Sequence, residues 1–579
     1  MSIAWSRYFP WLRWGRHYRR IDLATDVLAG VIVTIMLIPQ SLAYAMLANL
    51  PLHTGLYAGL LAPLLYALCG GSRVLAVGPV AVVSLMTASA VGPLAAHSGL
   101  PPTAVALTLA LMVGLMSLAM AALGLGAIAH FLSHPVISGL MSASALIIAI
   151  GQLKHIFGIP IDGATLPPLL EGLWQHLGTL HAATTVIGIA AILFLLWAER
   201  KLKPLLRRIG LGETLADMLA RLSPVLAVIG GIVAVRVFGL SDVRVVGDIP
   251  RGLPPFTVPP LDPALLREML WPALMITLIG FIESVAVAQS FAARRRENVD
   301  PSEELRGLGL ANLAAACSGA YPVSGGLSRT VMSYAAGAVS PLAGVFTGVL
   351  VAATLGWLTP YFHDLPHAVL AATIIVSIVK LIDVRGTLKI WRVSRADGIA
   401  LAVTALFTLI YGVETGLLAG VLTAVGDFLW RASRPHFAIV GRVPGTEHFR
   451  NVRRHQVIES ERVLTVRVDG SLVFCNAAWL EDLVGELVAV RPLLTDVILM
   501  CPGVNTIDAS GLESLERINE RLQTGGLRLH LSEVKGPVMD RLAVSGLLEH
   551  LSGEVFLSQF QAMSRLDAAV LSDCPAVAR

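Results

Sequence analysis

The sequence predicts a polytopic α-helical membrane protein with about fourteen transmembrane spans. They form a seven-plus-seven inverted repeat with two central half-helices, and a small cytoplasmic α/β domain follows. Three observations predict this class. Of the 579 residues, 55% are hydrophobic and 14% are charged, whereas soluble domains carry about 25% charged residues. Apolar stretches near the roughly 20 residues that cross a bilayer recur between residues 27 and 430. Two segments of the first half also recur in the second.

Charged residues are distributed unevenly along the chain. The last 139 residues hold 32 of them, 14 basic and 18 acidic, whereas the first 440 hold 50, 29 basic and 21 acidic. We therefore expect a transmembrane domain over residues 1–440 and a cytoplasmic domain over residues 441–579. Residues 1–22 are aromatic and basic, which predicts a cytoplasmic lead-in rather than a cleaved signal peptide. The net charge of +4 arises in the membrane part, so it indicates topology and not a nucleic-acid partner.

Basic clusters predict the sidedness of the spans. They precede the first span and follow the sixth, eighth and twelfth, so all lie inside if the N-terminus is inside. These clusters are Arg13, Arg16, Arg19 and Arg20; Arg200, Lys201, Lys203, Arg207 and Arg208; Arg294, Arg295 and Arg296; and Arg385, Lys389, Arg392 and Arg395. Arg236, Arg244 and Arg251 near a predicted outer loop are mild counter-evidence. We expect a bacterial inner membrane location with both termini cytoplasmic.

The internal repeat has one ungapped offset. Residues 34–45 (TIMLIPQSLAYA) align with residues 277–288 (TLIGFIESVAVA) at an offset of 243, with four identities. Pro79-Val80 aligns with Pro322-Val323 at the same offset. Seven spans in each half make the two halves inverted in the membrane, which is the plan of many secondary transporters with a midplane site.

The segments around Pro79 and Pro322 each predict an extended stretch that enters a short helix. Unwound backbone is tolerated at membrane depth only where protein or a water-filled cavity satisfies it. Two half-helices from inverted repeats point their N-termini at each other, and each terminus offers unpaired N–H groups and partial positive charge. The gap between them is therefore a predicted anion site. Gly325 and Gly326 allow close backbone approach, and Ser324 and Ser328 can donate further hydrogen bonds.

Arg329 stands at the start of the second half-helix, in the sequence SGGLSRT. A cation is unfavourable at a helix N-terminus, so Arg329 needs an anion or a carboxylate beside it. The alternative is an arginine near the interface that extends its head to water.

Glu283 is the other charged residue predicted within the membrane. A carboxyl that changes protonation beside an anion site couples anion movement to protons, and the alternative is a permanent ion pair with Arg329. Gln40, its repeat mate, cannot titrate and is expected to bind substrate by hydrogen bonds. Tyr44, one turn further along, either walls the pocket or belongs to the core.

Other chemistry has little support in the sequence. Five scattered cysteines form no disulfide framework, and no Cys/His spacing suits a metal. No Ser-His-Asp or His-Glu-x-x-His arrangement is present, so we expect no cofactor, no metal and no enzyme activity.

From Val463, strands alternate with helices over about 100 residues, which predicts a small α/β domain; its expected strands include LVFCN at residues 472–476. Asp508 and Ser510 are placed to cap a helix that begins near Gly511.

Taken together, these segments resemble the SulP family of anion transporters with a C-terminal STAS domain. The resemblance spans nearly the whole chain and is carried by DVLAGVIVTIMLIPQSLAYAMLANLPLHTGLYAGL, GSRVLAVGPVAVVSLM, FIESVAVAQSFA, GGLSRTVMSYAAGA and VNTIDASGLESL. It implies a core and a gate that move by an elevator-like mechanism, usually in a homodimer. The anion site that it implies comprises Gln40, Tyr44, Pro79, Val80, Ala81, the Glu283–Ser284 region, Ser328 and Arg329.

One position departs from the STAS pattern. STAS domains of bacterial anti-sigma-factor antagonists carry the sequence Asp-Ser-Ser, and their middle serine is phosphorylated, whereas this chain has Asp508-Ala509-Ser510. The serine that would accept the phosphate is missing, so regulation by phosphorylation at this position is not expected. A cytoplasmic protein that binds the domain is still one of the expectations.

The sequence thus predicts proton-coupled uptake of a small anion, with sulfate as the first expectation. C4-dicarboxylates such as succinate and fumarate, and then bicarbonate, are alternatives, because helix termini and one arginine suit any compact anion. A membrane-anchored signalling protein that acts through the STAS domain is an alternative of another class, and a nucleobase permease is a third. The latter needs no cation at its central site.

Overall fold

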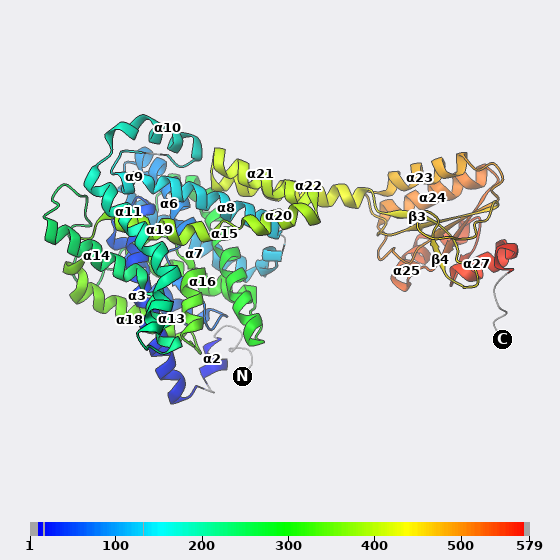
Figure 1. Cartoon of the computed structure of the whole chain (residues 1–579). Helices are drawn as coiled ribbons and strands as arrows, with labels where there is room; N and C mark the ends of the chain where they lie inside the picture. The colour runs from blue at the N-terminus through cyan, green and yellow to red at the C-terminus, as the bar shows by residue number, and fades with distance from the viewer. Residues whose placement is uncertain (1–9, 16–17, 131–132, 162, 573–579) are drawn as a thin grey trace. The chain divides into compact units, whose positions relative to one another are not determined.

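The computed structural model describes residues 10–15, 18–130, 133–161 and 163–572. The chain divides into two compact units, residues 1–424 and 425–579 (Figure 1). Each unit has its own buried hydrophobic clusters. The boundary predicted at residue 441 lies inside strand β3 (Phe437–Arg442), which pairs with other strands of the second unit. Because β3 is itself largely apolar, the change in charge content comes after the structural division.

The first unit is helical. The helices of its first half are α2 (Trp11–Trp14), α3 (Arg20–Leu47), α4 (His53–Ala58), α5 (Ala62–Cys69), α6 (Ala81–Ser98), α7 (Pro102–Ala122), α8 (His134–Gly151), α9 (Leu153–Phe157), α10 (Leu166–His176), α11 (Ala182–Trp197), α12 (Lys203–Arg208), α13 (Glu213–Arg221) and α14 (Ser223–Phe238). Those of its second half are α15 (Pro263–Arg295), α16 (Pro301–Cys317), α17 (Leu327–Ala335), α18 (Leu342–Ala353), α19 (His367–Ile378), α20 (Val384–Val393), α21 (Arg395–Tyr411) and α22 (Val413–Ser433), the last of which continues into the second unit.

Many of these helices suit a bilayer. The described residues contain nine helical stretches that are long and apolar enough to cross a membrane, and some of these stretches join two of the helices named above. Two shorter apolar stretches cover His53–Cys69 and Ser223–Phe238. The polytopic helical class is therefore confirmed. The total of about fourteen spans stays a prediction, because several apolar helices are short or broken.

The two halves of the unit are interleaved into two bundles. In the first bundle, α3 and α5 pack against α18, and α7 packs against α15 and α16. In the second bundle, α8 packs against α21, and α11 and α14 pack against α19. The bundles meet where α3 contacts α14 and α19. Each bundle thus combines helices from both halves.

The repeat is visible in the helices themselves. Helix α3 begins at Arg20 and α15 at Pro263, positions that are 263 − 20 = 243 residues apart. The repeat mates Thr34 and Thr277 make the same bond, each hydroxyl donating to the carbonyl four residues earlier, at 2.6 and 2.7 Å. Equivalent residues therefore have equivalent local structure.

The second unit is a six-stranded sheet with helices on its faces. The strand order is β4-β3-β5-β6-β7-β8, in which β5 to β8 run parallel and β3 runs antiparallel to β4 and β5. The strands after β3 are β4 (Phe449–Asn451), β5 (Val463–Val468), β6 (Asp496–Met500), β7 (Arg528–Ser532) and β8 (Val555–Phe556). The helices are α23 (Ala477–Ala489), α24 (Ala509–Thr524), α25 (Gly536–Ser545), α26 (Leu547–His550) and α27 (Gln559–Leu566).

Alternation along β6 gives the sheet two buried faces. Val497 and Leu499 pack in the cluster formed with α23 to α26, whereas Ile498 and Met500 pack with α27. The predicted α/β domain is therefore confirmed, with one correction. Residues 472–476 are not a strand: Leu472 makes a single bridge to Ile507 and a turn follows. The Asn476 side chain accepts the Val473 N–H at 3.0 Å, which favours this turn over a ladder.

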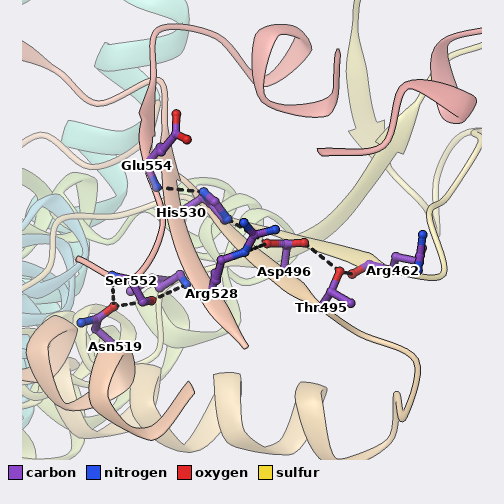
Figure 2. A network of polar contacts seen from close by, with 9 residues as sticks. Arg462, Thr495, Asp496, Asn519, Arg528, His530, Ser552 and Glu554 are labelled. Atoms are coloured by element: carbon purple, nitrogen blue, oxygen red, sulfur yellow. Dashed lines mark hydrogen bonds and ion pairs between the residues drawn. The ribbon is translucent and has the colours of Figure 1, made fainter. Parts of the chain in front are cut away.

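A buried polar network joins the first residues of β6 and β7 (Figure 2). The Asp496 carboxylate accepts from the Thr495 hydroxyl at 2.7 Å, from Arg528 Nε at 2.8 Å and from His530 Nε2 at 3.0 Å. The Glu554 N–H donates to His530 Nδ1 at 2.9 Å, so the ring hydrogen that faces Asp496 is on Nε2. Because the second ring nitrogen is occupied by a backbone amide, this Asp–His pair holds strands together and activates no hydroxyl.

Burial opposes ionisation of Asp496, but the hydrogen bonds from Thr495, Arg528 and His530 outweigh it and hold the pKa of Asp496 below its usual value. A depressed folded-state pKa contributes stability that is present above the unfolded pKa of about 3.9 and is lost as pH falls through the folded value. The network is thus an acid-sensitive part of the second unit.

We predict that Asp496→Ala lowers the free energy of unfolding of the isolated second unit without α22, residues 434–579, by about 2–3 kcal/mol, because a buried donor loses its acceptor. Urea unfolding measures this difference. The variant should also lose less stability than the wild type between pH 5 and pH 3, taken as a window around the unfolded pKa of about 3.9. Asp482→Ala, the same change at an exposed site of α23, is the control and should stay within about 0.5 kcal/mol of wild type.

Candidate functional site

Two short strands, one from each half, pair where the two repeats meet inside the first unit, and we call them the crossing strands. Strand β1 (Val77–Gly78) pairs antiparallel with β2 (Ser324–Gly325), with Val77 opposite Gly325 and Gly78 opposite Ser324. Each strand leads into a helix, β1 into α6 and β2 into α17. The two strands lie on opposite sides of the repeated prolines, β1 just before Pro79 and β2 just after Pro322, and their antiparallel pairing brings these two stretches side by side. The two predicted half-helices are therefore present.

Both helix N-termini open onto one cavity of about 500 Å³, lined here by Val80, Ala81, Gly326, Leu327 and Ser328. The residues that precede the two helices have extended backbone, and no side chain caps either helix. The first N–H groups of α6 and α17 are consequently available to a ligand, and they carry the positive ends of two helix dipoles.

Arg329 lies in the first turn of α17 and is 1% exposed. Its Nη1 donates to the Pro79 carbonyl at 2.7 Å, which joins the second repeat to the first. Its Nε and Nη2 are buried and have no hydrogen-bond partner among the described residues. A buried guanidinium with two unused donors can accommodate an oxyanion. This burial does not fit the alternative in which Arg329 extends to the interface.

Acceptor groups face the same cavity. Gln40 and Tyr44 of α3 and Glu283 of α15 all line it. Oε1 of Gln40 and Oε2 of Glu283 are buried without a partner among the described residues. Within the residues that the structure describes, no ion pair within 4.0 Å joins Glu283 to Arg329, so the permanent pair is not observed. The guanidinium of Arg329 and the carboxyl group of Glu283 instead line the same cavity without pairing with each other.

Of the eleven predicted site residues, seven line the cavity. They are Gln40, Tyr44, Val80, Ala81, Glu283, Ser328 and Arg329. The other four, Pro79, Ser284, Ser324 and Gly325, are not among its lining residues. Pro79 holds Arg329, and the other three lie behind the site.

The residues behind the site fix the crossing strands. The Ser284 and Ser324 hydroxyls are 2.9 Å apart, both reach the Gly280 carbonyl at 2.7 Å, and the Gly325 N–H donates to Ser284 at 2.8 Å. Asn312 of α16 pairs with both backbone groups of Val323, accepting from its N–H at 2.9 Å and donating to its carbonyl at 3.0 Å. Extended backbone is thereby satisfied without water.

The sequence analysis missed Asn312 and the residues that segments 195–224 and 373–381 contribute to the cavity. The polar members of this second set are Glu199, Lys203, Asp217, Arg221, Ser223, Thr373, Ser377 and Lys380. Thr373 and Ser377 are polar residues four apart in an apolar helix, which is a readable pattern. The sequence analysis used Lys203 only as part of a basic cluster that indicates the cytoplasmic side, because the residues around Lys203 in the sequence do not indicate that it lies near a half-helix.

Inverted repeats that cross at a buried cationic cavity define a membrane transporter for anions. Residues 23–404 match the Sulfate permease family and residues 454–562 match the STAS domain. The chain belongs to the sulfate permease family, which confirms the resemblance read from the sequence and places the protein among permeases rather than enzymes.

Individual relatives cover most of the chain. It is 33% identical over 562 residues to sulfate transporter 4.1, chloroplastic, of Arabidopsis thaliana, covering 95% of this chain and 81% of the relative. It is 30% identical over 558 residues to a probable sulfate transporter of Mycobacterium tuberculosis (strain CDC 1551 / Oshkosh), covering 95% and 96%.

Two solved structures share the fold. One is the murine Slc26a9 anion transporter in an inward-facing state, with a TM-score of 0.88, 22% identity and coverage of 98% and 95% of the two chains. The other is the transmembrane domain of the cyanobacterial bicarbonate transporter BicA, with a TM-score of 0.58, 22% identity and coverage of 71% and 99%.

We predict that Gly326→Ala weakens anion binding at least about tenfold. An added Cβ at residue 326 comes within 2.7 Å of Nη2 and 2.9 Å of Cζ of Arg329. The backbone φ of −93° suits alanine, so the guanidinium must move. The KM for labelled sulfate uptake into proteoliposomes measures the effect. Gly92→Ala in α6, where an added Cβ meets nothing within 4 Å, should keep the wild-type KM; equal KM values for both variants would contradict the prediction.

Proposed function

We propose that the protein is a secondary active transporter of small anions, with proton-coupled sulfate uptake as its activity. The single observation that carries this proposal is the buried guanidinium of Arg329, which keeps two donors unused in a cavity that faces two uncapped helix N-termini. Neutral solutes such as nucleobases give no reason for a cation there. The names of the sulfate-transporting relatives support sulfate as the substrate.

Substrate binding is assigned to groups of both polarities. Arg329 and the N–H groups of α6 and α17 bind the anion, while Gln40, Tyr44 and Ser328 orient it by hydrogen bonds. The remaining predicted residues, Pro79, Ser284, Ser324 and Gly325, are proposed to act through the shape of the crossing strands.

Glu283 is proposed to couple transport to protons. Its carboxyl lines the same cavity as Arg329 and lacks a fixed partner among the described residues. An ionised Glu283 repels an entering anion and a protonated one admits it, so substrate and proton bind together.

The movement is proposed to be elevator-like. The bundle formed by α3 to α7 and α15 to α18 carries the crossing strands, and α8 to α14 with α19 to α22 form the opposing gate. The solved neighbour described as inward-facing supports a cytoplasm-facing state for this cavity. Cytoplasmic termini, an inner-membrane location, a homodimer and a partner of the STAS domain remain parts of the same proposal.

Dicarboxylates and bicarbonate are the alternative substrates, and the name of the BicA neighbour favours the second of these. We predict that labelled sulfate uptake into proteoliposomes exceeds labelled succinate and bicarbonate uptake, and that an inward proton gradient accelerates it. Glu283→Gln should remove this acceleration, because glutamine cannot titrate. Sulfate uptake that ignores the gradient in wild type, and is unchanged in Glu283→Gln, would falsify proton coupling.

We predict that Arg329→Ala raises the KM for the transported anion about 10- to 150-fold, the effect of losing a charged hydrogen bond worth roughly 1.5–3 kcal/mol. Expression should be retained, because the pairing of β1 with β2 does not depend on the Arg329 side chain. Arg385→Ala removes an exposed cation from α20 and serves as the control, with no expected change in KM. A wild-type KM in the Arg329 variant would exclude Arg329 from substrate binding.

A further inference from the structure

A second charged cluster lines the cavity away from the crossing strands. Asp217 of α13 lies between two cations: Lys203 Nζ is 3.0 Å from its Oδ1 and Arg221 Nε is 2.9 Å from its Oδ2. Glu213 lies 3.8 Å from Lys203 and 3.6 Å from Arg207, so the cluster holds three cations and two carboxylates. It therefore keeps one positive charge in excess.

The cluster lies at the border between this cavity and an adjoining one. Lys203, Asp217, Arg221 and Met332 line both the cavity of about 500 Å³ and an adjoining cavity of about 230 Å³. An ion that passes between the two cavities must pass these side chains. The other ion pair of the larger cavity, Lys380 with Glu199 at 2.8 Å, is one to one and leaves no excess charge.

The cations of the cluster are only partly satisfied. Lys203 and Arg221 both bind the Asp217 carboxylate, and Glu213 is further from Lys203, at 3.8 Å. Arg221 Nη1 reaches the Met332 sulfur at 3.7 Å, a weak acceptor. The hydrogen bond from Lys203 holds the pKa of Asp217 below its usual value, and Arg221 adds to this effect against the opposing effect of burial. Asp217 is therefore an anion already resident between the two cations.

We propose that Lys203 and Arg221 form an accessory binding station for the transported oxyanion, in which Asp217 is a tethered counter-anion that the substrate displaces. A carboxylate presents two oxygens to the two cations, as an oxyanion does, so substrate and Asp217 compete for the same donors. When the substrate leaves, Asp217 returns to the cations. The cluster thereby attracts anions to the mouth of the cavity without retaining them. This inference rests on the proposed anion transport.

The charge at the cluster can be measured without transport. In the full-length protein in detergent, Ala220→Cys places a thiol on the cavity lining beside the cluster. Its modification rates by an anionic and a cationic methanethiosulfonate are compared, after subtraction of the rates of the parent protein. Asp217→Asn should raise the anionic-to-cationic rate ratio about three- to tenfold, and Lys203→Gln should lower it similarly. Arg208→Gln removes the same charge from an exposed position of α12 outside the cluster and the cavity lining, and it should change the ratio less than about twofold.

Sulfate protection then tests binding. Sulfate should slow modification of the thiol in Ala220→Cys, also in combination with Arg329→Ala, because the station does not use Arg329. The half-protecting concentration should fall about three- to tenfold with Asp217→Asn and rise with Lys203→Gln. Shifted rate ratios without sulfate protection overturn the station, as does protection that Arg329→Ala abolishes or Asp217→Asn leaves unchanged.

Transport kinetics separate binding from a merely structural clamp. Asp217→Asn should lower both KM and kcat for sulfate presented on the side to which the cluster opens, because the anion binds more tightly and leaves more slowly. A clamp that only supports α13 would lower kcat with KM unchanged or raised, which overturns the proposal. If wild type transports no anion, the proposed function fails, whereas the labelling and protection results still decide the station.

Discussion

The hydrogen bond from Arg329, in the first turn of α17, to the Pro79 carbonyl joins the second repeat to the extended backbone of the first. Backbone groups at membrane depth need partners, and the pairing of β1 with β2 supplies them at the crossing. That geometry leaves the N-termini of α6 and α17 uncapped toward one cavity. The site's positive character thus follows from how the interruption in each repeat is stabilised.

Support for the crossing comes from side chains that no ligand needs to touch. Asn312 binds both backbone groups of Val323, and Ser284 links α15 to Gly325. Because these bonds satisfy the strand backbone, the side chains that line the cavity are not needed for that purpose. Gln40 and Glu283 accordingly keep oxygen atoms that have no partner among the described residues. A site that satisfied itself internally would offer nothing to a ligand. The hydrogen-bonded strands β1 and β2 therefore hold the site in place, while the unused donors of Arg329 stay available to a ligand.

The sequence carried much of the fold and part of the site. Apolar segment length and the offset of 243 residues identified the membrane class and the repeat, and seven of the eleven predicted site residues line the cavity. Ser324 was expected at the site as a hydrogen-bond donor beside the second half-helix, and Ser284 because of the family resemblance, yet both bind the backbone of the strands behind the cavity. Side-chain direction around an interrupted helix depends on packing partners that a repeat does not encode.

What the sequence alone determined was periodic or local: hydrophobic length, charge distribution, the two half-helices and the alternating pattern of the second unit. Tertiary structure decided which distant groups meet. It brought Lys203, Asp217 and Arg221 to the cavity of Arg329 and placed His530 against Asp496 across two strands. Such contacts arise because helices and strands pack according to their whole surfaces, and no short stretch of sequence specifies the surface that a remote element presents to it.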